Sequence, residues 1–322
     1  MQAKLDAKDY KILYELDANS RQTYRQIAKK VGLSKDSVIY KINAMRQLGI
    51  IKQFHTVIDV GKLNYISFRL YLKLQNCTPE KEEDIIRFFK SQKSVSWLVS
   101  IDGEYDIGMW ILVKSIKEMN ILWKDFAKKY QNQVENKWLT IFTKVSYFPR
   151  AYLLEKKSNF DEYVFVTEPA DEQIEKKELE LLENLASNAR ISVLELARKL
   201  GITPKTAASW IKSLEKRKII IGYRTVFDLE KLGYQYFKVH FNLHNITPEK
   251  EMKLRQFIKQ QPNIIFDNQV LGGNDIEIEV QVKSLLELKN VINEMKESFS
   301  GIIKDYNHMW FYKEHKFIFM PV

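Results

Sequence analysis

The sequence predicts an α+β protein made of two copies of one unit, in which three short helices precede a βαββαβ segment. Three observations predict this fold. The chain matches itself at an offset of 169 residues, which indicates an internal repeat. Each half begins with apolar residues at helical spacing around a tight glycine turn. Each half then changes to apolar residues at every second position, interrupted by two further helical segments.

The repeat covers almost the whole chain. Gly32 matches Gly201, and Asp59 matches Asp228. In the same register, Thr-Pro-Glu-Lys at 78–81 recurs at 247–250, and Val-Lys-Ser at 113–115 recurs at 282–284. Agreement at one fixed offset over about 150 residues is implausible by chance. We therefore interpret residues ~1–150 as copy one and residues ~170–319 as copy two.

The first three helices of copy one are indicated by their capping residues. Asp6 is suited to cap the first helix, and Thr23 the second. Gly32 permits the left-handed backbone of a sharp turn, and Ser34 can cap a third helix that runs to about Leu48. Copy two repeats these signals. Two helices joined by a tight glycine turn, with a leading helix before them, predict a helix-turn-helix in each copy.

The rest of each unit alternates strands and helices. In copy one the expected order is a strand over 68–74, a helix over 79–91, strands over 95–101 and 106–113, a helix over 115–130 and a strand over 138–143. The order βαββαβ is that of a ferredoxin-like module. Its antiparallel sheet carries helices on one face only, so the other face needs water or a partner.

These elements divide the chain into four domains and a linker. We expect winged-type helix-turn-helix domains at 1–60 and 171–230, ferredoxin-like domains at 61–150 and 231–322, and a linker at 151–170. Within the linker, the tract Tyr-Val-Phe-Val at 163–166 has the composition of a short strand.

Composition narrows the class of protein. The 322 residues are 45% hydrophobic and 29% charged, and no apolar run is long enough to cross a membrane. Cys77 is the single cysteine, so no internal disulfide forms, and we expect a cytoplasmic protein. The net charge of +10 favours a polyanionic partner.

The positive charge is unevenly placed. Residues 1–60 hold 11 Lys and Arg against 6 Asp and Glu, a difference of +5, whereas residues 171–230 hold 11 against 10, a difference of +1. Double-stranded DNA binding is therefore better supported for copy one than for copy two.

Both copies resemble the Lrp/AsnC family of prokaryotic transcription regulators. The matching residues are Leu5-Asp6, Asn19-Ser20-Arg21, Ile27-Ala28, Val31-Gly32-Leu33-Ser34, Val38, Ile42, Gly49-Ile50-Ile51 and the turn Gly103-Glu104-Tyr105-Asp106. The resemblance implies a regulator with a DNA-binding helix-turn-helix and a βαββαβ module for effector binding and self-association. It also implies that small-molecule effectors, often amino acids, bind near the Gly-x-Tyr-Asp turn. The effector candidates are Gly103, Tyr105, Asp106, Gly272 and Asp275.

This chain departs from the family pattern in three ways. It is a tandem fusion, it replaces the turn tyrosine in copy two with Asn274, and it carries Lys218 where copy one has Gly49. Fusion suggests a pseudo-dimer that reads two half-sites with diverged helices. The free sheet face of copy one carries Arg69, and that of copy two carries Glu277 and Glu279, which favours packing of one face on the other. The alternative is that the face of copy two lies in water.

The predicted DNA contacts lie on and before the two recognition helices. In copy one the groove-facing candidates are Lys35, Asp36, Ser37, Tyr40 and Lys41, and the phosphate candidates are Arg21, Arg25 and Lys30. In copy two the candidates are Lys205, Thr206, Ser209, Trp210 and Lys212, with Arg190 as the counterpart of Arg21.

Other functions find less support in the sequence. No cofactor is expected, because the glycines form no nucleotide-binding loop and no His and Cys cluster at metal-ligand spacing. The chain is predicted not to be an enzyme. Sirohaem decarboxylases share the Lrp-like architecture as paired or fused units, but residues 17–21 read Asp-Ala-Asn-Ser-Arg, which is the regulator pattern. A co-regulator without its own operator binding is a further alternative.

Overall fold

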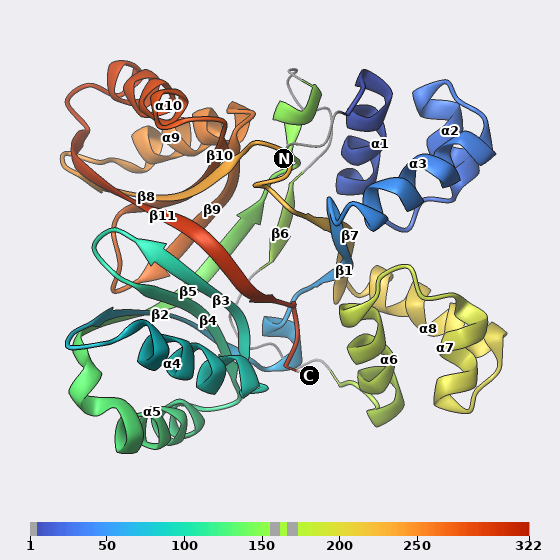
Figure 1. Ribbon diagram of the computed structural model, residues 1–322, viewed down its shortest axis with the longest axis horizontal. Coiled ribbons are helices and arrows are strands. Elements are labelled where there is room, and N and C mark those ends of the chain that lie inside the picture. The colour runs from blue at the N-terminus through green and yellow to red at the C-terminus, as the bar shows by residue number, and fades with distance from the viewer. Residues whose placement is uncertain (1–4, 155–161, 166–172, 322) are drawn as a thin grey trace.

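The computed structural model describes residues 5–154, 162–165 and 173–321. It confirms the α+β class and two helix-turn-helix domains. Figure 1 shows the βαββαβ modules on the left, α1–α3 at the upper right and α6–α8 at the lower right. In the described ranges no helix is both long enough and apolar enough to span a membrane.

The first half of the chain contains fourteen described elements. They are α1 (Ala7–Ala18), α2 (Tyr24–Val31), α3 (Lys35–Gln47), β1 (Ile51–Ile58), η1 (Gly61–Leu63), β2 (Ile66–Leu74), α4 (Pro79–Ser91), β3 (Val95–Asp102), β4 (Ile107–Val113), α5 (Ile116–Tyr130), η2 (Gln131–Gln133), β5 (Val134–Tyr147), η3 (Ala151–Leu154) and β6 (Tyr163–Phe165).

The second half repeats the same order. Its elements are α6 (Lys176–Ser187), α7 (Val193–Leu200), α8 (Pro204–Lys216), β7 (Ile220–Phe227), β8 (Gln235–Leu243), α9 (Pro248–Gln260), β9 (Ile264–Leu271), β10 (Ile276–Val282), α10 (Leu285–Ser298) and β11 (Ile303–Phe317).

Two long strands join the modules into one closed sheet. β5 pairs with β2 as far as Ile141 and then with β9 of copy two. β11 pairs with β8 as far as Trp310 and then with β3 of copy one. The ring β2-β4-β3-β11-β8-β10-β9-β5 closes because β5 returns to β2. The strand expected over 138–143 is observed as the longer β5, because its second half pairs with β9 of copy two.

The closed sheet has one half in each copy, hereafter the two sheets. The outer face of each sheet forms a separate hydrophobic core under the helices of its own copy. In copy one, Phe68 and Leu70 of β2 pack against Phe89 of α4 and Phe126 of α5. In copy two, Phe237, Val239 and Phe241 pack under α9 and α10 in the equivalent way. Figure 1 shows each helix pair on the outer side of its sheet.

The inner faces of the two sheets lie against each other within one chain. Arg69 donates from Nη2 to Oε1 of Glu279 at 3.0 Å, and both side chains are buried. Lys238 and Glu277 of copy two are also buried and lie 3.0 Å apart. The sheet face of copy two is therefore not left in water.

The helix-turn-helix domains are joined by an antiparallel ribbon of β1 and β7, hereafter the ribbon. Its contacts are reciprocal at the repeat offset. Thr56 donates to the Leu185 carbonyl at 2.7 Å, and its counterpart Thr225 donates to the Leu16 carbonyl at 2.8 Å. The ribbon thus packs each strand under the first helix of the other copy.

The tract predicted as a linker is partly integrated into the fold. Ala151–Leu154 forms η3, three of whose residues are buried, and β6 pairs with β5. The Tyr163 hydroxyl donates to the Ala18 carbonyl at 2.8 Å, and its ring lies where any side chain on Gly222 would be. Residues 155–161 and 166–170 of this tract, including Val166 of the expected strand, lie outside the described residues.

Candidate DNA-binding surface and ligand cavity

The helix-turn-helix of copy one is fixed by two caps and a glycine. Thr23 accepts from the Gln26 N–H at 3.2 Å, and Ser34 accepts from the Ser37 N–H at 3.1 Å. Gly32 adopts φ +67° between the two helices. These are the roles expected from the sequence, and they set the angle between α2 and α3.

Copy two uses the same devices. Ser192 caps α7, Gly201 adopts φ +61°, and Thr203 accepts from the Thr206 N–H at 3.1 Å. The turn after α8 differs. There Lys218 adopts φ +58°, and its counterpart Gly49 adopts φ +69°. This left-handed backbone is strained for lysine, which has a Cβ, but not for glycine.

The recognition helices α3 and α8 expose their first turns. Tyr40 is 75% exposed, and Lys35 is exposed as well. In α8, Lys205, Ser209 and Lys212 are exposed. The remaining candidates on these helices are Asp36, which is exposed, and Ser37, Lys41, Thr206 and Trp210, which are half-buried.

Two basic candidates make ion pairs inside copy one. Lys30 donates to Glu15 at 2.6 Å. Lys41 donates to Asp6 at 2.8 Å and to Asp9 at 3.0 Å, and this hydrogen bond to Asp6 raises the pKa of Lys41. The same contact lowers the pKa of Asp6 to about 2. DNA would have to compete with these carboxylates for both lysines.

Arg21 and Arg190 bridge the two helix-turn-helix domains. Arg21 donates to the Ala189 carbonyl at 2.6 Å, and Arg190 donates to the Ser20 carbonyl. Between the domains lies a groove of about 330 Å³, which Arg25 and Lys35 also line. The structure thus brings four basic side chains from both copies to one place.

The turn residues proposed for an effector are engaged in structural contacts. Asp106 accepts from the Leu74 N–H at 2.6 Å and from Lys73 at 3.0 Å, and Tyr105 is buried against Tyr71. In copy two, Asp275 accepts from the Leu243 N–H at 2.7 Å.

The turn glycines approach the other copy. A side chain on Gly103 would meet Met309 of β11, and the Gly272 carbonyl accepts from the Trp138 indole at 3.0 Å. None of the five effector candidates lines the large cavity described next.

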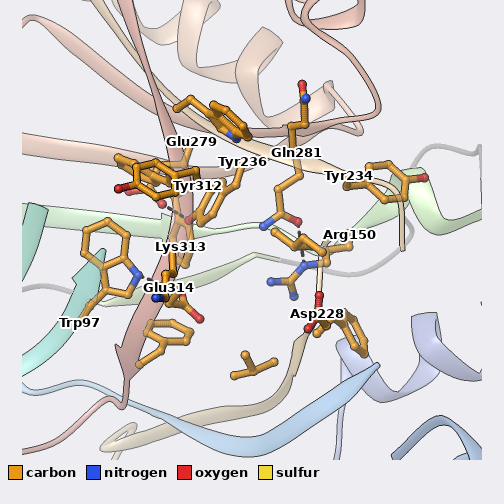
Figure 2. Close-up of a pocket in the computed structure, with 18 of the residues that line it drawn as sticks. Trp97, Arg150, Asp228, Tyr234, Tyr236, Glu279, Gln281, Tyr312, Lys313 and Glu314 are labelled. Carbon is orange, nitrogen blue, oxygen red and sulfur yellow. Dashed lines mark hydrogen bonds between the residues drawn. The ribbon is translucent and has the colours of Figure 1, made fainter. Parts of the chain in front are cut away.

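A cavity of about 570 Å³ lies between the inner sheet faces and the ribbon, hereafter the ribbon cavity. Its floor is formed by side chains of the inner faces, and its opposite wall by Lys52 of β1, Val226 and Phe227 of β7 and the connection that follows β7. Figure 2 shows Trp97, Glu314 and Tyr236 on one side of it and Arg150, Gln281 and Asp228 on the other.

Hydrogen bonds fix the polar groups of the cavity wall. Glu279 accepts from Arg69 and from Asn268 at 2.9 Å. The Trp97 indole donates to Glu314 at 2.9 Å. Burial raises the pKa of the Glu314 carboxyl and, with the Glu279 charge, that of the Tyr236 hydroxyl.

Sequence reasoning placed Arg69 and Glu279 on the facing sheets but missed the cavity. Arg150 was assigned to the end of copy one, and the residues after β7 to a domain boundary. Only the pairing of β11 with β3 brings Trp310, Tyr312 and Glu314 to this site. The sequence signal that could have indicated the cavity is the presence of two aromatic residues and one acidic residue at alternate positions of one strand.

Comparisons with known proteins agree with the repeat. A model of winged helix-turn-helix DNA-binding domains matches residues 5–52 and 174–221, which are related by the 169-residue offset. An uncharacterised helix-turn-helix type transcriptional regulator of Pyrococcus furiosus is 30% identical over 127 residues, which are 39% of this chain and 84% of the relative. One copy thus corresponds to one whole relative.

Solved structures resemble either one copy or the whole chain. The structure of B. subtilis LrpC is 23% identical and matches 45% of this chain and 98% of its own, with a TM-score of 0.39. The sirohaem decarboxylase NirDL matches 98% of this chain and 94% of its own, with a TM-score of 0.63 and 13% identity. Both structures are less than 25% identical to this chain, so these likenesses concern the fold alone.

The fold and the exposed recognition helices define a helix-turn-helix DNA-binding transcription regulator. The chain belongs to the Lrp/AsnC family and carries the family's unit twice in tandem.

Proposed function

We propose that the fused copies act as a pseudo-dimer whose α3 and α8 read two unequal half-sites on double-stranded DNA. The reciprocal contacts of the ribbon carry this proposal, because they pair the two domains in one chain while leaving both recognition helices exposed. Helix-turn-helix dimers place such helices in successive major grooves of one DNA face.

The exposed candidates receive the direct contacts. Lys35 and Tyr40 on α3, and Lys205 and Ser209 on α8, are free to reach base edges or phosphates. Arg25 in the basic groove is suited to phosphate. Arg21 and Arg190 have a different role in this proposal, since they hold the two domains in register by donating to backbone carbonyls of the other copy.

The two half-sites are expected to differ in sequence and in strength. α3 begins Lys35-Asp36-Ser37, and α8 begins Pro204-Lys205-Thr206. Charge also differs, since the first domain carries +5 and the second +1. Because charge on the protein governs non-specific affinity, copy one should supply more of the salt-dependent binding.

Titration against genomic fragments that include the protein's own promoter tests the proposal. We expect selective binding that weakens by about 10³-fold or more between about 50 and 200 mM salt. Lys205→Ala with Ser209→Ala should weaken one half-site in a footprint, and Lys35→Ala with Tyr40→Ala the other, by about 10-fold or more each.

Lys124→Ala is the matched control, because Lys124 is exposed on α5 of a βαββαβ module. It should leave both half-sites unchanged. Weak binding without sequence preference would contradict the proposal and favour a co-regulator. Equal loss at both half-sites from either pair of substitutions would contradict the assignment of one helix to one half-site.

An amino-acid effector at the turns of residues 103–106 and 272–275 is a further part of the proposal, supported by the family resemblance. Self-association through the βαββαβ modules is proposed on the same ground. Calorimetric titration with the standard amino acids, and sedimentation with and without them, tests both. We expect a protein of this function in the cytoplasm.

One observation favours a second candidate. NirDL resembles the whole tandem chain and has also been solved with an iron-uroporphyrin III analogue, so this chain could act on a tetrapyrrole. Against it, residues 17–21 read Asp-Ala-Asn-Ser-Arg, which is the regulator pattern. A tetrapyrrole absorbance in the purified protein, or decarboxylation of sirohaem, would favour the enzyme.

A further inference from the structure

We propose that the ribbon cavity binds a flat aromatic anion and that its occupancy changes the geometry of the ribbon. The resulting control of DNA binding rests on the proposed function. The binding site itself does not, because it is defined by the cavity alone.

The walls of the cavity are unusually aromatic. Of its 29 lining residues, 13 are Phe, Trp or Tyr, whereas 12% of the chain is aromatic. Trp310 is 37% exposed and Tyr312 48% exposed, with ring centroids 6.0 Å apart on β11. Large aromatic side chains left this accessible on a cavity wall are suited to stack against a planar ring system.

The charges of the wall favour an anion. The cations are Lys52, Arg69, Arg150, Lys283 and Lys313, and the acidic residues are Asp228, Glu230, Glu279 and Glu314. The five cations thus outnumber the four acidic residues by one. Lys313 makes no ion pair with any described residue and lines the same cavity as Trp310 and Tyr312.

A buried amide provides an unused hydrogen-bond donor. Gln281 is 1% exposed, and its oxygen accepts from Arg150 Nε at 3.0 Å and from the Tyr152 hydroxyl at 2.6 Å. These bonds direct its amide nitrogen towards the cavity (Figure 2), where no described residue accepts from it. A buried donor without a partner costs free energy, so an acceptor on a ligand would relieve that cost.

Only copy two provides these polar groups. The counterparts of Glu279 and Gln281 in copy one are Trp110 and Leu112, both of them buried. Copy two thus contributes hydrogen-bonding side chains to the cavity at positions where copy one has apolar ones, and Trp110 itself lines the same cavity. A fused chain permits such asymmetry, whereas a homodimer of one unit does not.

Residues of the cavity wall contact β1 and α1, which position the helix-turn-helix domains. Asp228, just after β7, donates from its N–H to the Ile50 carbonyl at 2.8 Å and lies 3.4 Å from the Lys52 ammonium. On the other side, Arg150 donates to Asp17 of α1 at 2.5 Å. A ligand that contacts Gln281, Arg150 and the ribbon would therefore bias the position of α1 and β7 together.

Fluorescence titration of the full chain with 8-anilinonaphthalene-1-sulfonate, a flat aromatic anion, tests the site. We expect saturable binding of one molecule per chain. Trp310→Ala and Tyr312→Ala should each weaken it by about 10-fold, and Lys313→Glu by a similar factor. Lys304→Glu is the matched control, since Lys304 is exposed on the same strand outside the cavity. Equal affinity in all four variants, or no saturable binding, would overturn the site.

Hydrogen exchange tests the coupling without DNA. The saturated protein should exchange the amides of 220–234 several-fold more slowly than the free protein, and the Lys313→Glu protein should show a smaller change at the same probe concentration. Unchanged exchange in the saturated protein would overturn the coupling. A DNA titration with and without the probe then follows. If no DNA fragment binds, the proposed function fails while the first two measurements still decide the cavity and its coupling.

Discussion

At the scale of single residues, one carboxylate holds the two copies together beneath the ribbon. Asp17 of α1 is 0% exposed and accepts from Arg150 at 2.5 Å and from Arg224 at 2.7 Å. Arg224 lies on β7 of the other copy, opposite His55 on β1. The guanidinium of Arg224 also packs 4.1 Å from the centroid of the Tyr147 ring. Because Asp17 and Arg150 belong to copy one and Arg224 to copy two, this network forms only when both copies are in place.

Asp17→Asn should lower the free energy of unfolding by about 3–5 kcal/mol, because two buried guanidinium groups lose their counter-charge. Urea denaturation followed by circular dichroism measures this loss. Asp125→Asn, on the exposed face of α5, is the control and should change it by less than about 0.5 kcal/mol. A loss below about 1 kcal/mol for Asp17→Asn would contradict the role given to this carboxylate.

Two buried histidines predict acid sensitivity. Burial, and then the charges of Arg150 and Arg224, hold the pKa of His55 well below its ordinary value, and burial lowers the pKa of His240 to about 3. Between about pH 6.5 and the depressed values, the unfolded chain binds protons that the folded chain does not. The free energy of unfolding should therefore fall with falling pH by about 1.4 kcal/mol per unit for each histidine.

Unfolding measured at pH 7.5 and 5.0 checks this dependence. His55→Phe should reduce the loss between the two pH values, because His55 packs between Phe317 and Phe319 and neither ring nitrogen has a hydrogen-bond partner among the described residues. The exposed His244→Phe should leave it unchanged. An identical loss in the wild type and His55→Phe would show that His55 does not contribute.

At the scale of elements, the turns after the recognition helices give an internal comparison. α3 ends before Gly49, which is suited to its positive φ, whereas α8 ends before Lys218 at nearly the same φ. A left-handed lysine is strained, although glycine increases the entropy of the unfolded chain. The second copy therefore carries a strain that the first avoids.

Lys218→Gly should raise the free energy of unfolding by about 0.5–1 kcal/mol. The reverse change Gly49→Lys should lower it by more, because the new Cβ would also lie 2.7 Å from the Lys231 ammonium. Chemical denaturation of the two variants beside the wild type provides the measurement. A destabilised Lys218→Gly protein would show that the lysine makes a contact worth more than its backbone strain.

At the scale of the whole molecule, strand sharing makes the two modules interdependent. Each of β5 and β11 begins in its own sheet and ends in the other, and Arg69 meets Glu279 between the sheets. Neither sheet can separate without loss of a strand half. The βαββαβ modules are therefore expected to behave as one folding unit.

Calorimetry and tryptophan fluorescence should report one coincident unfolding transition for both modules. Arg69→Met should shift this transition as a whole and lower the free energy of unfolding by about 3 kcal/mol, because the buried Glu279 would keep only the longer contact with Lys238, at 3.7 Å, as a counter-charge. Lys73→Met, at the partly exposed end of the same strand, is the control. Two separate transitions would contradict the shared-strand architecture.

The sequence by itself determined the repeat, the two helix-turn-helix domains and the alternation of strands and helices. These depend on local signals, since Thr23, Gly32 and Ser34 act on backbone within a few residues. The family resemblance also follows from such local signals. The opposed charges of Arg69 and Glu279 on the two sheets were visible as a pattern.

Only the tertiary structure decided how the copies join. The crossing of β5 and β11, the pairing of β1 with β7 and the ribbon cavity all depend on contacts between residues more than a hundred positions apart. Arginine is a common phosphate ligand, yet the guanidinium of Arg21 donates a hydrogen bond to the carbonyl of Ala189. Sequence periodicity shows which face of an element is apolar, but the partner of that face depends on the packing of the whole chain.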